Sequence, residues 1–234
     1  MKSPNLINYS VANSVTEAVI SRRSLRAFLS TPVSNEVIQK ILDKAARAPS
    51  GTNMQPWQVY VTTGDTRQAL SEAACEAFDN QQGKYNSEKR YYPEKWFEPY
   101  ISRRRKVGWD LYGLLEIEKG DRQKTHDQHR RNFQFFGAPV GIIFTIHRQL
   151  ATGSWLDYGM FLQNIMLLAR EAGLHTCPQA AWADYHKVIR SVLPISDDEI
   201  VVCGMAIGYA DRDAVVNTLV TERVGAEQFT LFLD

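Results

Sequence analysis

The stretch Pro49-Ser50-Gly51-Thr52-Asn53-Met54-Gln55-Pro56-Trp57 separates a helical pattern from a strand pattern. Before it, apolar residues recur at helical spacing from the candidate N-cap Ser34 to Ala45, and after it Gln58–Thr63 alternates as a strand does. Pro and Gly constrain such a connection, while Ser, Thr, Asn and Gln offer uncharged hydrogen-bonding groups. The stretch therefore predicts a loop that binds a flat heterocycle with carbonyl and imide edges. The alternative is a plain turn into the strand, with Trp57 as a core anchor.

Helix and strand patterns alternate loosely along the rest of the chain. Ser14-Val15-Thr16-Glu17 has the form of a capping box and predicts a short helix through Ile20. Residues 138–146 and 200–207 are short apolar runs, which predict strands buried on both faces. Further helices are expected over 66–79, 101–118, 124–135, 156–172 and 184–192, and a long loop over 81–99. Because no repeat or linker divides the pattern, we expect one domain over residues 1–234, of the α/β or α+β class.

Composition and charge exclude several classes of protein. The 27 basic residues nearly balance the 26 acidic ones, so no basic field attracts nucleic acid or anionic lipid. No apolar run approaches the roughly 20 residues that span a bilayer, and residues 1–14 lack the apolar block of a signal peptide. Three cysteines without close spacing fit a reducing cytoplasm. We therefore expect a cytoplasmic protein without nucleic-acid or membrane partners. His126 and His129 read as two solvated histidines without a completed metal pattern, so no metal is expected.

Two further segments have the composition of ligand-binding turns. Arg22-Arg23-Ser24-Leu25-Arg26 places three guanidinium groups and a hydroxyl after the first predicted helix. One guanidinium group can bind two phosphate oxygens at once. The alternative is a solvated basic turn. In the second segment, Gly173 ends the apolar helix, and Pro178 with small residues then lets a ligand approach the backbone. The alternative there is a plain connection from helix to strand.

Together and in this order, the motifs resemble the FMN-dependent nitroreductase family. The resemblance covers residues 15–223 and is closest to the subgroup that reduces nitrobenzoate-like nitroaromatic compounds. It rests on R-R-S-x-R at 22–26, P-S-G-x-N-x-Q-P-W at 49–57 and G-L-x-T-C-P-Q at 173–179, with support from Gly208-Tyr209-Ala210-Asp211 and Thr221-Glu222-Arg223.

The resemblance implies an α+β fold, a three-layer α/β/α sandwich with a mixed, mostly antiparallel sheet. It implies a homodimer with a domain-swapped C-terminal arm, two FMN molecules at the interface and the apolar helix 156–172 at the dimer centre. NAD(P)H would deliver hydride to flavin N5 and leave, and a small nitroaromatic substrate would then be reduced to nitroso and hydroxylamine products. No protein side chain is expected to act as a catalytic acid or base, because the cofactor carries the chemistry.

The resemblance also assigns residues to the cofactor. The phosphate and ribityl chain would be held by Arg22, Arg23, Ser24, Arg26 and Arg223. Pro49, Ser50, Gly51 and Asn53 would reach the flavin from the partner subunit, and Pro178, Gln179, Ala180, Ala181 and Asn132 would lie along the isoalloxazine. Some bacterial relatives carry a Glu-Gly pair where this chain has Ala180-Ala181, so a carboxylate that orients the nicotinamide is not expected here.

Substrate specificity is expected from residues 85–112, which hold eight of the 25 aromatic residues. We interpret this segment as a cover above the flavin that stacks flat substrates, with Tyr92, Trp96 and Trp109 as candidates. The alternative is an aromatic surface helix that packs on its own core. Two other functions stay open: a flavoenzyme of the same fold with another reaction (dehalogenation, quinone or flavin reduction, heterocycle oxidation), and a flavin-binding protein without turnover.

Overall fold

The computed structural model describes residues 7–80 and 85–234, so the first four residues of the predicted loop 81–99 and the first six of the chain lie outside it. Its elements, in chain order, are α1 (Val15–Ser21), α2 (Asn35–Ala45), η1 (Gly51–Asn53), β1 (Trp57–Thr62), α3 (Gly64–Asn80), α4 (Tyr100–Leu114), α5 (Arg122–Arg130), η2 (Arg131–Gly137), β2 (Val140–His147), α6 (Thr152–Glu171), β3 (His175–Gln179), η3 (Ala180–Tyr185), α7 (His186–Val192), β4 (Glu199–Gly208), η4 (Val215–Thr218) and η5 (Ala226–Gln228).

Four strands form one sheet in the order β1-β2-β4-β3, with every neighbouring pair antiparallel. The two central strands are β2 and β4, which explains why their sequences are nearly all apolar. Among the described residues, the one parallel contact with the sheet is an isolated bridge between Ser24 and Thr176. The sheet is thus mostly antiparallel as expected, and its mixed character is confined to that bridge.

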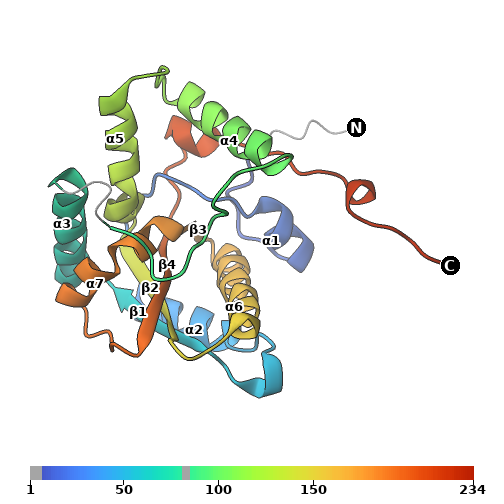
Figure 1. Cartoon of the computed structure of the whole chain (residues 1–234), viewed down its shortest axis with the longest axis horizontal. Helices are drawn as coiled ribbons and strands as arrows, with labels where there is room; N and C mark the ends of the chain where they lie inside the picture. Colours follow the sequence, from blue (N-terminus) through green and yellow to red (C-terminus); the bar gives the residue numbers. More distant parts are fainter. Residues whose placement is uncertain (1–6, 81–84) are drawn as a thin grey trace.

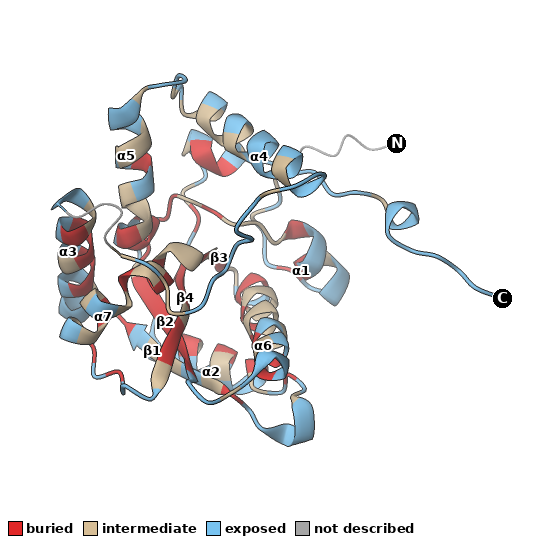
Figure 2. Cartoon of the chain, viewed as in Figure 1, coloured by how far each residue is buried: buried red, intermediate tan, exposed pale blue. Residues whose placement is uncertain are grey.

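Helices cover both faces of the sheet, which confirms the three-layer arrangement (Figure 1). One buried cluster joins α3, η2, η3 and α7 to the sheet, and a second joins α2 and α6 to the other face. In Figure 2 the strands are mostly buried, while the chain beyond η4 leaves the body of the molecule as an exposed arm. Within residues 7–80 and 85–234, no helix has the length and apolar character needed to cross a membrane.

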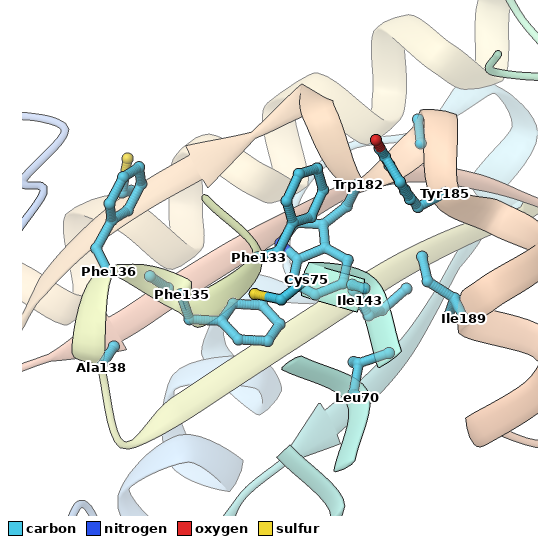
Figure 3. Close-up of a cluster of buried hydrophobic side chains, with 14 of the residues drawn as sticks. Leu70, Cys75, Phe133, Phe135, Phe136, Ala138, Ile143, Trp182, Tyr185 and Ile189 are labelled. Carbon is cyan, nitrogen blue, oxygen red and sulfur yellow. The ribbon is translucent and has the colours of Figure 1, made fainter. Parts of the chain in front are cut away.

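Two glycines let aromatic rings lie directly on the sheet. Trp182 stacks on Phe135 with ring centroids 4.6 Å apart, and Phe133 meets it edge-on at 5.3 Å (Figure 3). A Cβ atom at Gly204 would lie 2.2 Å from Trp182, and one at Gly141 would lie 2.5 Å from Phe135. This packing fixes η2 and η3, and with them the backbone on either side of the candidate site.

Several predicted elements are confirmed by their caps. The Ser14 side chain accepts a hydrogen bond from Glu17 N at 3.1 Å, and that of Ser34 accepts one from Val37 N at 3.4 Å, at the starts of α1 and α2. The apolar helix starts earlier than predicted, at Thr152. One side of it is buried, but Leu156 is 72% exposed in the isolated chain.

Three predictions of local structure were wrong. Strand β3 was not predicted, because it has five residues and contains Pro178, which a strand tolerates at a sheet edge. The helix predicted over 124–135 ends at Arg130, and a 3-10 segment follows in which Phe135 and Phe136 adopt positive φ. The helix predicted over 101–118 ends at Leu114, before the positive-φ residue Glu116.

Candidate functional site

The arginine-rich segment 22–26 is held between β3 and the chain that follows β4. Leu25 N donates to Thr176 O at 3.1 Å, next to the bridge from Ser24. Arg26 N donates to Asn217 Oδ1 at 2.8 Å, and Asn217 Nδ2 donates to Ala27 O at 2.8 Å. The main chain is therefore fixed on two sides, and Arg22, Arg23 and Arg26 are half-buried rather than fully solvated.

The guanidinium groups of Arg22, Arg26 and Arg223 form a cluster that has no carboxylate partner in the described chain. Burial and the nearby Arg223 guanidinium both lower the pKa of Arg22. Burial raises the pKa of the Cys177 thiol to about 11, against the opposing effect of Arg26 and Arg22, so both arginines lie near this buried residue of β3. Among residues 7–80 and 85–234, no ion pair links Arg22, Arg26 or Arg223 to an acidic side chain. This concentration of unpaired positive charge can bind a dianion.

A cavity of about 1180 Å³ brings together residues from β3, η3, η2 and α6. The residues Pro178, Gln179, Ala180, Ala181 and Asn132, which the family resemblance would place along the flavin, all line it. Gln179 Nε2 donates to Asn132 O at 2.6 Å, so the two predicted positions are in direct contact. The remaining lining comes from residues 87 and 89–94, from residues 150–152 and Trp155 around the start of α6, from Ala183 and Asp184, and from Val201 and Val202 of β4.

Two polar groups near these features lack partners within the described chain. Gln179 Oε1 and Arg23 Nη1 are buried and make no hydrogen bond. Gln179 is 3% exposed, so its free oxygen is held in place beside the cavity rather than turned to solvent. Buried unpaired polar groups are costly, and a bound molecule that offers a donor to Gln179 and an acceptor to Arg23 would remove that cost.

The loop that carries Pro49, Ser50, Gly51 and Asn53 does not enter the cavity of its own chain. Gly51 N donates to the buried Asp157 Oδ2 of α6 at 3.0 Å, and Gln55 N donates to Ser50 Oγ at 3.0 Å. Thr52, Asn53 and Gln55 adopt positive φ, which is uncommon outside glycine. The loop is thus held on α6 in an exposed conformation, away from the cavity of its own chain.

The three aromatic substrate candidates occupy different surroundings. Tyr92 lines the cavity. Trp96 does not, but it packs on Tyr92 with centroids 5.2 Å apart and lies under the Arg104 guanidinium at 4.8 Å. Trp109 is 71% exposed on α4 and does not line the cavity. Of the segment predicted to cover the flavin, Ser87 and residues 89–94 line the cavity, and α4 does not.

Some residues that shape the site gave no signal in the sequence. Asn217 lies in a tail with little local pattern, and Asp157 is one carboxylate in an apolar helix. Asn217 accepts a hydrogen bond from Arg26, which lies 191 positions away in the chain, and Asp157 accepts one from Gly51, which lies 106 positions away. Of the two histidines predicted to be solvated, His129 is exposed and lies 2.9 Å from the Tyr112 hydroxyl, whereas His126 is half-buried and faces Asp79 at 3.3 Å. In the described part of the chain, no three metal-binding side chains gather.

Comparisons with known proteins agree with this geometry. The model of the nitroreductase family matches residues 19–209. The chain is 44% identical to a 4-nitrobenzoate reductase from Pseudomonas putida, over 92% of this chain and 93% of the relative. It is 41% identical to a chloronitrobenzene nitroreductase from Comamonas testosteroni, over 94% and 96%.

Solved structures extend the comparison to the fold. The FMN and NADPH-dependent nitroreductase NfnB from Sphigopyxis sp. strain HMH matches with a TM-score of 0.91 and 39% identity, over 94% of this chain and 99% of that one. The FMN-dependent nitroreductase NfnB from Mycobacterium smegmatis, solved in complex with NADPH, matches with a TM-score of 0.89 and 27% identity, over 94% and 97%. The family match, the near full-length relatives and the shared fold lead to one conclusion: this chain belongs to the nitroreductase family.

Proposed function

We propose that this chain is an FMN-dependent nitroreductase that uses NAD(P)H to reduce nitrobenzoate-like nitroaromatic compounds to nitroso and hydroxylamine products. The observation that carries the proposal is the cluster of Arg22, Arg26 and Arg223, which lacks carboxylate partners and shares β3 with the wall of a large cavity. The 44% identity to a 4-nitrobenzoate reductase supports the choice of substrate class.

The residues present fit FMN. Three guanidinium groups match a dianionic phosphate. Its negative charge would compensate for the lost hydration and for the repulsion from Arg223 that lower the pKa of Arg22. The unpaired Gln179 Oε1 fits a donor on the polar edge of a flavin ring, and the unpaired Arg23 Nη1 fits an acceptor. The cavity, at about 1180 Å³, has room for a flat tricyclic ring and a substrate above it.

Each part of the chain has a defined role in this proposal. Bound FMN supplies the two-electron transfer from NAD(P)H to the nitro group. Arg22, Arg26 and Arg223 bind its phosphate, Ser24 and Arg23 support the ribityl chain, and the main chain from Pro178 to Ala181 supports the ring. Ala180 and Ala181 offer no carboxylate, so the nicotinamide is oriented by shape and by backbone groups. Tyr92 stacks on the aromatic substrate from the cavity's outer side.

We also propose a cytoplasmic homodimer in which residues 15–223 form one FMN-binding domain. Large apolar side chains are exposed on α1 and α6, with Val15 at 76%, Ile20 at 72% and Leu156 at 72%. The C-terminal arm adds Phe229, Leu231, Phe232 and Leu233, all at least 72% exposed. Exposure of this much apolar surface is typical of an interface. The loop 49–55 on α6 would then reach the partner's flavin.

Light scattering on the eluting protein tests the dimer. We expect twice the mass of the 26.6-kDa chain, and a shift toward one chain mass when Leu156 is changed to Arg. The change Leu231→Ser should weaken the dimer as well, because it removes an apolar contact of the arm. A monomeric parent protein that retains FMN would contradict the proposal.

Product analysis tests the function. The purified protein, supplied with FMN and NADPH, should reduce 4-nitrobenzoate, with hydroxylaminobenzoate as the accumulating product. An iodotyrosine, a quinone and free flavin serve as alternative acceptors in the same assay. They test for dehalogenation, quinone reduction and flavin reduction. Faster turnover of one of these than of every nitroaromatic tested would assign the protein to that reaction.

A further inference from the structure

Residues 85–94, here called the strap, form one side of the cavity and are pinned at one end. Ser87 N donates to Asp184 Oδ1 at 2.9 Å. Beyond this point the strap lines the cavity from Lys89 to Glu94, together with Asn132 and residues 178–181. In Figure 1 it is the green segment that runs across the front of the sheet toward α4. The pinned end therefore lies at the cavity wall, because Ser87 and Asp184 both belong to the lining.

Glu88 is the centre of an ion cluster at the pinned end. Its carboxylate accepts a hydrogen bond from Arg148 Nη2 at 2.7 Å and lies 3.3 Å from Arg190 Nη2 and 3.5 Å from His186 Nδ1. The Glu88 side chain is 18% exposed, that of Arg190 16% and that of His186 14%. Burial raises the pKa of Glu88, but the hydrogen bond from Arg148 and the nearby His186 and Arg190 together bring it below its usual value.

Arg148 and Arg190, which contact Glu88, also donate hydrogen bonds to main-chain oxygens near the start of β4. Arg148 donates through Nε to Asp197 O at 3.0 Å, and through Nη2 to Glu199 O at 3.2 Å. Arg190 Nη2 also donates to Glu199 O. Both arginines are thus held at the start of β4, so Glu88 docks into a site whose position the sheet determines. Most other ion pairs of the described chain are more exposed, such as Lys44 with Glu171 at 62% and 59%.

We propose that Glu88 is a positioning residue that, by docking on Arg148 and Arg190, sets how the strap crosses the cavity and thereby which nitroaromatic substrates bind. The proposal rests on the proposed function for the identity of the substrate. Glu88 itself lies outside the cavity lining, whereas its neighbours Ser87 and Lys89 belong to it. Its effect therefore reaches the substrate through Tyr91 and Tyr92, and not through direct contact.

The test compares Glu88→Gln with the matched control Glu171→Gln, both as FMN-loaded proteins. Glu88→Gln should raise the KM for 4-nitrobenzoate about tenfold while kcat stays within about twofold, because the strap no longer holds the substrate's outer side in place. Trypsin should also cleave after Lys89 or Arg90 several times faster in this variant, with sites mapped by mass spectrometry. Glu171→Gln should match the parent protein in both measurements.

A second test removes Arg148, the hydrogen-bond partner of Glu88. Arg148→Gln should change KM and cleavage in the same direction. The double variant Glu88→Gln/Arg148→Gln should change them by less than the product of the single effects, because one contact is lost in all three. If Glu88→Gln or Arg148→Gln behaves as Glu171→Gln does, the inference is wrong. If the parent protein reduces no nitroaromatic, the proposed function fails, while the cleavage rates still decide whether Glu88 holds the strap.

Discussion

At the scale of single residues, Arg22 carries much of the proposed cofactor site. Its charged neighbour is another guanidinium, that of Arg223, and burial lowers its pKa further. A side chain in these surroundings is stabilised by an anion and costs free energy without one. The sequence revealed it because three arginines and a serine within five residues form a local pattern.

The substitution Arg22→Ala should weaken FMN binding by about 10- to 100-fold, since a hydrogen bond to a charged group contributes about 1.5–3 kcal/mol. The midpoint of thermal unfolding of the flavin-free protein should stay the same or rise, because a repulsive contact is removed. Quenching of FMN fluorescence measures the first and circular dichroism the second. Arg105→Ala, at an exposed position of α4, is the control. Equal FMN affinity in the two variants would place the phosphate elsewhere.

A second residue, His175, makes stability depend on pH. It is 3% exposed, and Arg170 Nη1 lies 3.0 Å from its Nε2. Burial and the Arg170 charge lower the pKa of His175 to about 3. In the unfolded chain the imidazole has its usual pKa of about 6.5, so between these values the unfolded state binds the extra proton.

The free energy of unfolding should therefore fall as the pH drops below about 6.5, with a slope from His175 that approaches 1.4 kcal/mol per pH unit. Urea unfolding of the flavin-free protein at pH 7, 6 and 5 measures this slope. His175→Gln should reduce it, whereas His147→Gln, at an exposed position, should not. Identical slopes in all three proteins would mean that folding does not change the protonation of His175 between pH 7 and 5.

At the scale of elements, the contact between β4 and η3 depends on the absence of a side chain at Gly204. A Cβ atom there would lie 2.2 Å from the Trp182 ring, which is fully buried and cannot move away. Gly204→Ala should lower the free energy of unfolding by about 1–3 kcal/mol, as overpacking of a core does.

The matched control is Gly113→Ala on α4, where an added Cβ meets nothing within 4 Å. It should raise stability by about 0.5–1 kcal/mol, because Ala favours a helix over Gly. Thermal unfolding of both variants measures the two opposite shifts. A stabilised Gly204→Ala would show that Trp182 does not pack on β4.

Elements with a long or regular pattern could be predicted from the sequence, and those built by tertiary contacts could not. Strands β2 and β4 and helix α2 follow from apolar runs and helical spacing. Strand β3 did not, because five residues with Pro178 give no alternation to detect. The predicted end of α5 was wrong because residues 131–137 form a 3-10 segment instead, in which Phe135 and Phe136 adopt positive φ and Phe135 packs on Trp182 and the sheet.

The same difference applies to the site. The motifs at 22–26, 49–57 and 173–181 are local, so their residue types predicted ligand-binding turns, with a plain turn or connection as the alternative. Their joint resemblance to one family then assigned them to the phosphate and the ring. Asn217, Asp157 and Glu88 act through partners distant in the chain, and a single sequence carries no trace of such contacts. Trp109 had the residue type of a substrate contact but lies on the exposed side of α4, away from the cavity.

At the scale of the whole molecule, the sheet brings four distant segments into one place. Residues 22–26 dock on β3, whose last residues begin the cavity wall, and Asn217 and Arg223 return from the C-terminal side. The strap and the start of α6 supply other parts of the lining. A cluster of guanidinium groups and a large cavity thus share one strand, an arrangement that fits the proposed phosphate-bearing flavin.

The measurement that tests the central claim most directly is the visible spectrum of the FMN-loaded protein as NADPH is added without oxygen. If the protein is an FMN-dependent nitroreductase, its yellow colour should bleach with about one equivalent of NADPH and return when 4-nitrobenzoate is added. A protein that bleaches without recovery by any nitroaromatic would keep the cofactor and exclude the proposed acceptor. A protein that takes up no FMN would contradict the account as a whole.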